Sequence, residues 1–284
     1  MKINHNMIAR VDSHHHFWEL SRGDYDWLTP ELTNIYRDFL PNDIIDDLRC
    51  SDVTQTILVQ AAASEDETRY LLRIAETTDF VKGVVGWVNM ESNNALKQLE
   101  KFSTNPYFKG IRPMLQDIKN VNWILNDQFD SIFKFLGANN LTFDALISEV
   151  HLANIDLIAK KHPDIKMVIN HCAKPSLSTA PSKFWLDAIR NISSRENVHI
   201  KFSGLFTEAP TGKVEPHIIK PFFEHVLECF GAGRIMWGSD WPVIKLNGDY
   251  HSWLDTSDYL LQGLPFELQH KVWAQNARQF YNLT

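Results

Sequence analysis

The 284-residue sequence contains few cysteines and no long apolar run, and both absences exclude whole classes of protein. The three cysteines, Cys50, Cys172 and Cys229, are odd in number and widely spaced, which argues against a disulfide framework and fits a reducing compartment. No apolar stretch approaches the length needed to cross a bilayer, and residues 1–6 contain no signal-peptide core. We therefore expect a cytoplasmic protein that does not bind membranes.

An excess of positive charge is also missing. The 35 acidic residues outnumber the 28 lysines and arginines, and the resulting net charge of -7 argues against nucleic-acid binding as a main function. No glycine-rich phosphate fingerprint follows the first strand pattern, which weakens a dinucleotide-binding interpretation. No linker, low-complexity segment or internal repeat interrupts the chain, so residues 1–284 predict a single domain.

What the sequence does contain is a regular alternation of strand and helix patterns. The first strand pattern is Met7–Val11, and the others lie at 55–61, 81–88, 108–113, 141–148, 165–170, 198–204 and 234–238. Each is separated from the next by a long connection that includes a helical pattern, which is typical of parallel strands. The eight strands and the chain length favour an α/β fold with a single (β/α)8 TIM barrel over an open sheet. Helical patterns at 252–261 and 265–281 add an extra C-terminal helix to this barrel.

Reactive side chains gather where these strand patterns end. Alternation places His14 and His16 on one face and turns His15 away, so the first two can hold one cation between them. His171 follows the sixth strand pattern and Asp240 follows the eighth. Because barrel active sites lie at the carboxyl ends of the strands, we predict that these residues form one site. The alternatives are a structural turn at the histidine pair and a capping role for Asp240.

Further polar and aromatic residues at the same end are candidates for substrate binding. Arg112 offers a planar guanidinium to a carboxylate, hydroxyl or carbonyl, and a structural ion pair is the alternative. His151 opens a helix after the fifth strand and either faces the pocket or lies exposed in the first turn. Lys201 and Ser203 share one face of the seventh strand, so one of them could line the barrel mouth. The other candidates, for which packing or buried hydrogen bonding is the plainer role, are Trp27, Gln60 and Trp87.

Taken together, these motifs resemble the amidohydrolase superfamily and, more closely, its lactonase branch. The superfamily pattern is the His-x-His pair, the later histidine and the final aspartate. The motifs that resemble the branch are, in chain order, Asp12–Trp18, Tyr25–Leu28, Lys109–Pro113, Asn170–Pro175, Lys201–Leu205, Gly238–Pro242 and Asn276–Tyr281. The resemblance spans nearly the whole chain. It implies hydrolysis of a sugar-acid lactone, such as fuconolactone or rhamnonolactone, or of a pyrone dicarboxylate.

The resemblance also implies a chemistry for the site. Opening a lactone requires a nucleophilic water, a stabilised oxyanion and a proton for the leaving alkoxide, and Asp240 is expected to act as general base. One divalent metal, with zinc as the leading candidate, would be held by His14, His16, His171 and Asp240. In a metal-independent site, which is the alternative, the histidines hydrogen-bond to the water and the carbonyl oxygen. The fourth and fifth strand ends contain no lysine that could bridge two metals, which implies one metal at most.

Three functions stay open at the level of the sequence. The first is the lactone hydrolase, acting on a small-molecule substrate. The second is a metal-dependent non-oxidative decarboxylase of an aromatic or unsaturated acid, because the same branch includes such enzymes. The third is a silent carbohydrate-binding barrel, which the intact histidines and Asp240 disfavour. No nucleic acid or membrane partner is expected, and a homo-oligomer is left open.

Overall fold

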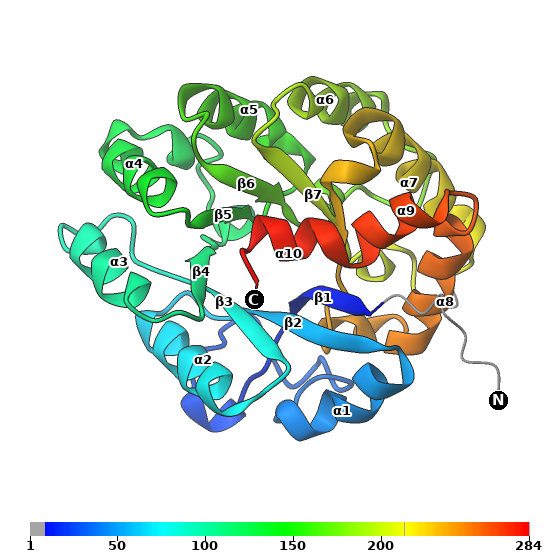
Figure 1. Cartoon of the computed structure of the whole chain (residues 1–284), viewed down its shortest axis with the longest axis horizontal. Coiled ribbons are helices and arrows are strands. Elements are labelled where there is room, and N and C mark those ends of the chain that lie inside the picture. The colour runs from blue at the N-terminus through cyan, green and yellow to red at the C-terminus, as the bar shows by residue number, and fades with distance from the viewer. Residues whose placement is uncertain (1–8, 213, 284) are drawn as a thin grey trace.

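The computed structural model describes residues 9–212 and 214–283, and its centre is a sheet of eight parallel strands that rolls into a barrel (Figure 1). The strands are β1 Arg10–His15, β2 Val53–Val59, β3 Val81–Gly86, β4 Phe108–Ile111, β5 Thr142–Ala145, β6 Lys166–Ile169, β7 Val198–Phe202 and β8 Ile235–Trp237. They pair in chain order, and a parallel bridge between His15 and Trp241 joins the two ends of the sheet. The predicted (β/α)8 barrel is therefore confirmed.

Helices surround the barrel, and most of them bury an apolar stripe against it (Figure 1). They are α1 Pro41–Cys50, α2 Glu65–Thr77, α3 Ala95–Ser103, α4 Asp130–Ala138, α5 Leu152–Lys161, α6 Lys183–Ser193, α7 Pro216–Phe230, α8 Tyr250–Leu261, α9 Phe266–His270 and α10 Asn276–Phe280. In α2, for example, the Ser64 hydroxyl accepts a hydrogen bond from the backbone N–H of Glu67 and caps the first turn. None of the helices in the described ranges is long and apolar enough to span a membrane.

Most predicted strand limits differ from the structure by one or two residues, and those of two strands differ by more. The sequence pattern places the first strand at Met7–Val11, but its first two residues lie outside the described residues and β1 continues to His15. The pattern of the fifth strand reaches Ser148, but β5 ends at Ala145. Apolar side chains continue beyond β5 because they pack in the core under the barrel mouth, so hydrophobicity alone overstates its length.

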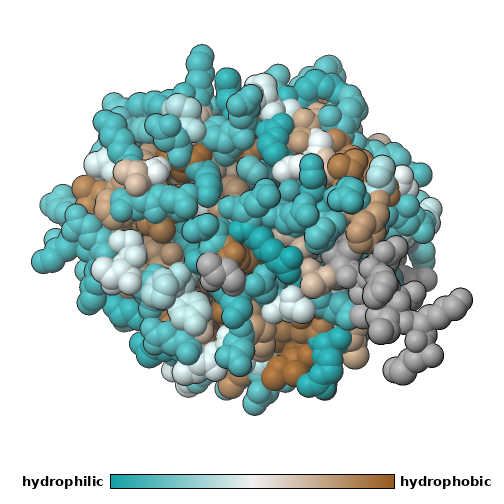
Figure 2. Space-filling model, viewed as in Figure 1, coloured by the Kyte–Doolittle hydropathy of each residue, from teal (hydrophilic) through white to brown (hydrophobic). Residues whose placement is uncertain are grey.

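The C-terminal segment covers the amino-terminal end of the barrel (Figure 1). A π-helical turn at Lys271–Gln275 joins α9 to α10. These three elements form one continuous helical segment, at the position of the helical pattern predicted for residues 265–281. Asn276 Nδ2 donates to the carbonyls of Ala232 and Ile235 at 2.7 and 2.6 Å, which anchors α10 at the start of β8. The face seen in Figure 2 is mostly hydrophilic. Closure of this end leaves the carboxyl ends of the strands as the mouth of the barrel.

Candidate active site

Closure of the barrel brings the end of β1 against the segment that follows β8. The backbone N–H of Asp240 donates to the carbonyl of His14 at 2.8 Å, and the N–H of His16 donates to the carbonyl of Trp241 at 2.7 Å. The buried carboxylate of Asp12 accepts from the N–H of His14 at 3.1 Å. Main-chain hydrogen bonds therefore place the two histidines beside Asp240.

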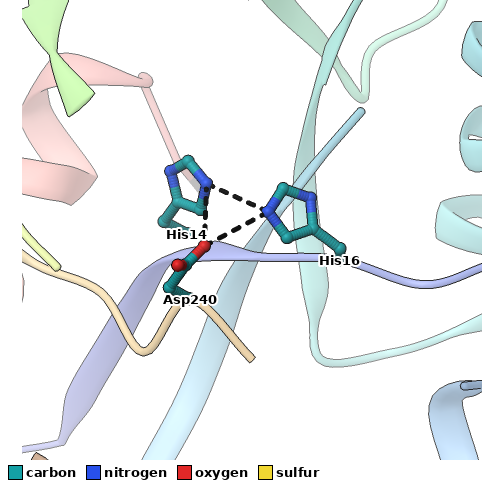
Figure 3. Close-up of side chains that lie close together, drawn as sticks. All are labelled: His14, His16 and Asp240. Carbon is teal, nitrogen blue, oxygen red and sulfur yellow. Dashed lines mark hydrogen bonds and ion pairs between the residues drawn. The ribbon is translucent and has the colours of Figure 1, made fainter. Parts of the chain in front are cut away.

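The three predicted histidines converge on one carboxylate oxygen of the fourth predicted residue, Asp240. The Nε2 atoms of His14 and His16 are 3.2 Å apart, and Oδ1 of Asp240 lies 3.6 and 3.4 Å from them (Figure 3). His171 follows β6, and its Nε2 is 3.8 Å from the same oxygen. All four side chains are buried. The structure thus assembles the predicted cluster at the carboxyl ends of the strands.

The turn that carries His171 has an unusual backbone. His171, Cys172, Ala173 and Lys174 all have left-handed φ angles, between 50° and 61°, and Asp240 has a φ of 59°. Each such non-glycine residue costs roughly 1–2 kcal/mol, and strain of this kind concentrates at functional sites. Cys172 is buried, and the left-handed turn places it there, since β6 has already ended at Ile169.

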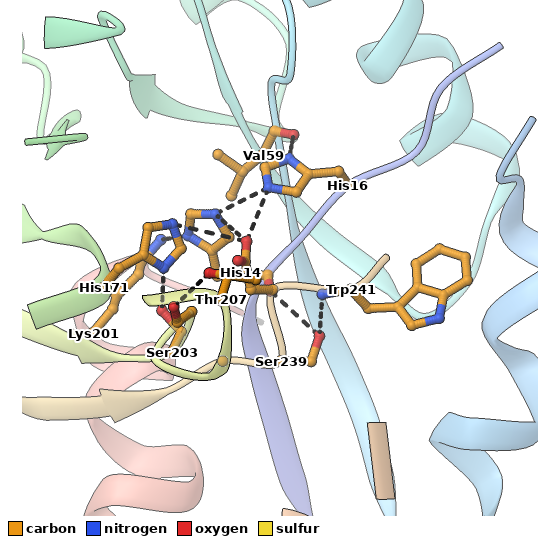
Figure 4. A network of polar contacts seen from close by, with 12 residues as sticks. His14, His16, Val59, His171, Lys201, Ser203, Thr207, Ser239 and Trp241 are labelled. Carbon is orange, nitrogen blue, oxygen red and sulfur yellow. Dashed lines mark hydrogen bonds and ion pairs between the residues drawn. The ribbon is translucent and has the colours of Figure 1, made fainter. Parts of the chain in front are cut away.

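Each histidine has a different partner on its outer nitrogen (Figure 4). Nδ1 of His16 lies 2.7 Å from the carbonyl of Val59, Nδ1 of His171 lies 2.9 Å from Oγ of Ser203, and Nδ1 of His14 lies 3.3 Å from Nζ of Lys201. A carbonyl can only accept, so His16 carries its proton on Nδ1 and presents the lone pair of Nε2 to the cluster. Ser203 reaches the site only through His171.

Burial determines the charges in this cluster. It lowers the pKa of His171 to about 3, and it lowers the pKa of His16 as well. The pKa of His14 lies well below its ordinary value because the Lys201 ammonium adds to the effect of burial. For Asp240, burial acts to raise the pKa, but His171 and His16 outweigh it and lower the pKa. At neutral pH the cluster therefore combines neutral imidazoles with a carboxylate.

A cavity of about 310 Å³ opens above the cluster, with His16, His171 and Asp240 in its lining. Arg112 also lines it and is only 3% exposed. Its guanidinium donates to the carbonyl of Gln60, its Nε has no partner, and none of the ion pairs in the described part of the chain involves it. Burial lowers the pKa of Arg112 to about 10, so the group stays charged. The charged guanidinium of Arg112 lines the cavity without an ion-pair partner among the described residues. The alternative role of Arg112, a structural ion pair, is therefore not what the structure shows.

Comparison with known proteins assigns the chain to a family and identifies similar proteins. The amidohydrolase family model matches residues 11–283. The chain belongs to the amidohydrolase family. It is 38% identical to an L-fucono-1,5-lactonase of Burkholderia ambifaria over 98% of this chain and 97% of that protein. An L-fucono-1,5-lactonase of Burkholderia multivorans is 31% identical over 85% of this chain and 84% of its own length. A zinc-bound amidohydrolase structure from Burkholderia multivorans is 28% identical with a TM-score of 0.92, over 97% of this chain and 99% of that one.

Family membership confirms the resemblance inferred from the motifs and identifies the protein as a hydrolase. The donor set of this amidohydrolase fits one divalent cation. Zinc bonds of 2.0–2.1 Å in a tetrahedron place neighbouring ligand atoms about 3.3 Å apart. The atoms of His14, His16 and Asp240 are separated by 3.2, 3.4 and 3.6 Å. Neutral imidazoles and an ionised carboxylate are also the protonation states that metal ligands need.

Of the other residues predicted to bind substrate in this amidohydrolase, some line a cavity and others do not. Trp27 lines the cavity and also a neighbouring one of about 740 Å³, where Trp87 lies. Gln60 is fully buried and donates to the carbonyl of Arg112 at 2.6 Å, so it supports that residue instead of lining the cavity. His151 is buried, which overturns the exposed-turn alternative, but it lines neither cavity and its Nδ1 contacts Ser148 Oγ at 3.1 Å.

The structure adds residues that were not predicted as site residues, although Lys174 and Tyr281 lie within the quoted motifs. Lys174 lines the cavity and pairs with Glu208 at 3.2 Å. Asp144 and Tyr281 lie buried close beneath His14, where both contact or face Lys201. One signal for Asp144 was available, since it is a lone carboxylate inside an apolar strand pattern. No local signal indicates that Tyr281 reaches into the barrel.

Proposed function

We propose that this amidohydrolase opens the ring of an uncharged sugar-acid lactone, with L-fuconolactone as the first candidate and an L-rhamnonolactone as the next. The observation that carries the proposal is the 38% identity with an L-fucono-1,5-lactonase along 98% of the chain. The buried cluster at the barrel mouth supports it, because the motif residues of this chain meet there. The cavity of about 310 Å³ suits a single sugar ring.

The charges around the cavity favour a neutral substrate over a dicarboxylate. Within residues 9–212 and 214–283, its two cationic side chains are Arg112 and Lys174, and Lys174 is already paired with Glu208. The neighbouring cavity is lined by carboxylates and, among the described residues, by no lysine or arginine. Its acidic residues are Asp24, Asp26, Glu91 and Asp117. A doubly charged pyrone would meet one unpaired cation among several carboxylates, whereas a polyhydroxylated lactone can donate hydrogen bonds to them.

In this proposal Asp240 is the general base. Its carboxylate accepts a proton from the attacking water while the water oxygen bonds to the carbonyl carbon. When the ring C–O bond breaks, Asp240 returns that proton to the leaving ring oxygen, and the product is the open hydroxy acid. Arg112 binds a carbonyl or hydroxyl oxygen of the substrate through its charged N–H groups.

We also propose that the cluster holds one divalent cation, with zinc as the first candidate. The separations among the donor atoms and the zinc in a related structure support this assignment. His14, His16, His171 and Asp240 would hold the ion. When bound, such an ion supplies polarisation of the carbonyl and a lower pKa for water.

A pH-indicator assay against a panel of aldonolactones tests the function, with a pyrone dicarboxylate as the anionic comparator. Each reaction is run with and without a chelator, and the metal content of the same sample is measured. We expect acid release from a neutral sugar lactone and a loss of at least 100-fold, in the range of about 10²–10⁴, in Asp240→Asn. Asp46→Asn is the matched control, because Asp46 is an exposed carboxylate outside the site.

Absence of acid release from every lactone would refute the proposed function, and full activity in Asp240→Asn would refute the role of that residue. Activity that disappears with the metal would support the ligand assignment. Activity that survives complete metal removal would refute a required metal and leave the histidines in direct hydrogen-bonding roles.

A further inference from the structure

A fully buried ion pair lies directly beneath the histidines. Nζ of Lys201 on β7 is 2.7 Å from Oδ2 of Asp144 on β5, and both side chains are completely buried. The Tyr281 hydroxyl donates to the same oxygen at 2.7 Å, and the Thr142 hydroxyl donates to Oδ1 at 3.0 Å. Burying two charges costs several kcal/mol per ion, and apolar residues often stabilise such a position as well. Stability alone therefore gives no reason for this pair.

A second polar contact of the ammonium, with His14, gives a reason for the pair. Nζ of Lys201 is 3.3 Å from Nδ1 of His14 (Figure 4). An ammonium group has three N–H donors and no lone pair, so Nδ1 must accept this hydrogen bond. A neutral imidazole has a single ring proton, which then resides on Nε2. We infer that Lys201 is a positioning residue that holds His14 as the Nε2–H tautomer and directs this proton into the cluster.

The neighbouring histidine matches this assignment. His16 donates from Nδ1 to the carbonyl of Val59, so its Nε2 is an acceptor. That acceptor lies 3.2 Å from Nε2 of His14, which the proposed tautomer makes a donor. The hydrogen bonds then run in one direction, from Lys201 through His14 and His16 to Val59, and every ring nitrogen in the chain has a complementary partner.

The tautomer has two consequences, and the first rests on the proposed lactone hydrolysis. The neutral N–H of His14 donates to Nε2 of His16, and this bond orients the imidazole of His16, which lines the cavity, for the proposed reaction. Secondly, a metal binds only a ring nitrogen with a free lone pair, so Lys201 works against His14 as a ligand. Lys201 therefore weakens metal binding at a cluster whose geometry fits one ion.

The direct test is the tautomer in the intact protein. We would label the histidines with ¹⁵N and record long-range ¹H–¹⁵N correlations of the metal-free enzyme, and assign the His14 signals by their absence in His14→Asn. The expected pattern is an unprotonated Nδ1 and a protonated Nε2. A protonated Nδ1 in the wild-type protein would overturn the inference, and this measurement requires no variant at Lys201 to fold.

A double variant tests the cause. Lys201→Met combined with Asp144→Asn removes both buried charges. The amide introduced by the second substitution can accept from one of the two hydroxyls, Tyr281 or Thr142, through its oxygen and can donate to the other through its NH2 group. We expect the proton of His14 to move to Nδ1 and zinc, measured by competition with a chromogenic chelator, to bind about 10- to 100-fold more tightly. Thr142→Val removes a hydroxyl that donates to Asp144 but keeps the ion pair with Lys201, and it is the control in which the tautomer stays as in the wild type. An unchanged tautomer in the double variant, or weaker zinc binding, would overturn the inference.

The assay separates this inference from the proposed function. If lactones are substrates, the double variant should lose kcat by at least tenfold with little change in KM, since the substrate-binding Arg112 is untouched. An equal loss through KM would count against a role in positioning His14. If no lactone is hydrolysed but the tautomer and the zinc affinities behave as expected, the proposed function fails and the assignment of Lys201 stands.

Discussion

Gly204→Ala should disable the site by displacing His171. Gly204 follows β7 with a left-handed φ of 63°, and a Cβ added there would lie 2.3 Å from Nδ1 of His171. Since ordinary contact begins at 3.4 Å, the imidazole has to retreat by roughly 1 Å. That movement breaks the hydrogen bond of 2.9 Å to Ser203. A misplacement of about 1 Å at a reacting centre can cost about 100-fold, so kcat/KM should fall by about that factor.

Gly23→Ala is the matched control for the backbone. Gly23 has nearly the same φ, 69°, but a Cβ there meets no atom within 4 Å. Both variants should lose about 1–2 kcal/mol because alanine is placed in a left-handed conformation. Gly204→Ala should lose a further 1–3 kcal/mol or so from overpacking. Urea unfolding and the lactone assay measure both quantities. Equal stability losses in the two variants, or full activity in Gly204→Ala, would refute the reasoning.

Two further predictions concern Arg112 and a buried histidine outside the cluster. Arg112→Lys keeps the positive charge but loses the planar guanidinium, which can form two parallel hydrogen bonds. The value of kcat/KM on the lactone should fall by about 10- to 100-fold, mainly through a higher KM. Unchanged kinetics would mean that Arg112 does not bind substrate. Burial, assisted by His16, lowers the pKa of His15 to about 3, so below pH 6.5 the unfolded chain binds a proton that the folded protein does not. The free energy of unfolding should therefore fall as the pH drops from 6.5 towards 3. His15→Gln can still form a hydrogen bond with Thr56 but cannot bind a proton, so it should reduce the slope of this pH dependence by up to about 1.4 kcal/mol per pH unit. Urea titrations at a series of pH values measure both slopes. Identical slopes for variant and wild type would contradict the assignment of a neutral, buried His15.

The fold follows from local sequence patterns because parallel barrel strands are buried on both faces. Each strand is therefore a short apolar run, and each connection contains an amphipathic helix, as at α2. Polar residues at the ends of such runs share the barrel mouth, which is why strand patterns alone predict that His14, His16, His171 and Asp240 meet. Position at a strand end does not predict cavity lining for Gln60 and His151, because both are buried but neither lines the cavity.

The left-handed turn at His171–Lys174 could not be predicted from the sequence. Cysteine, alanine and lysine have no local preference for positive φ, so the contacts of the surrounding barrel must hold them there. The same holds for Tyr281, which reaches Asp144 across 137 residues of sequence through the packing of the C-terminal segment against the barrel.

The sequence by itself determined the barrel, the order of its elements and the identity of the four residues that meet at its mouth. The tertiary structure decided which nitrogen of each histidine faces the cluster and which atom occupies the other side. Those partners are Val59, Ser203 and Lys201, and they come from other strands or strand ends. The physical reason is that periodicity determines the face on which a side chain lies, whereas the position of a ring proton depends on hydrogen-bond partners that only folding brings within reach.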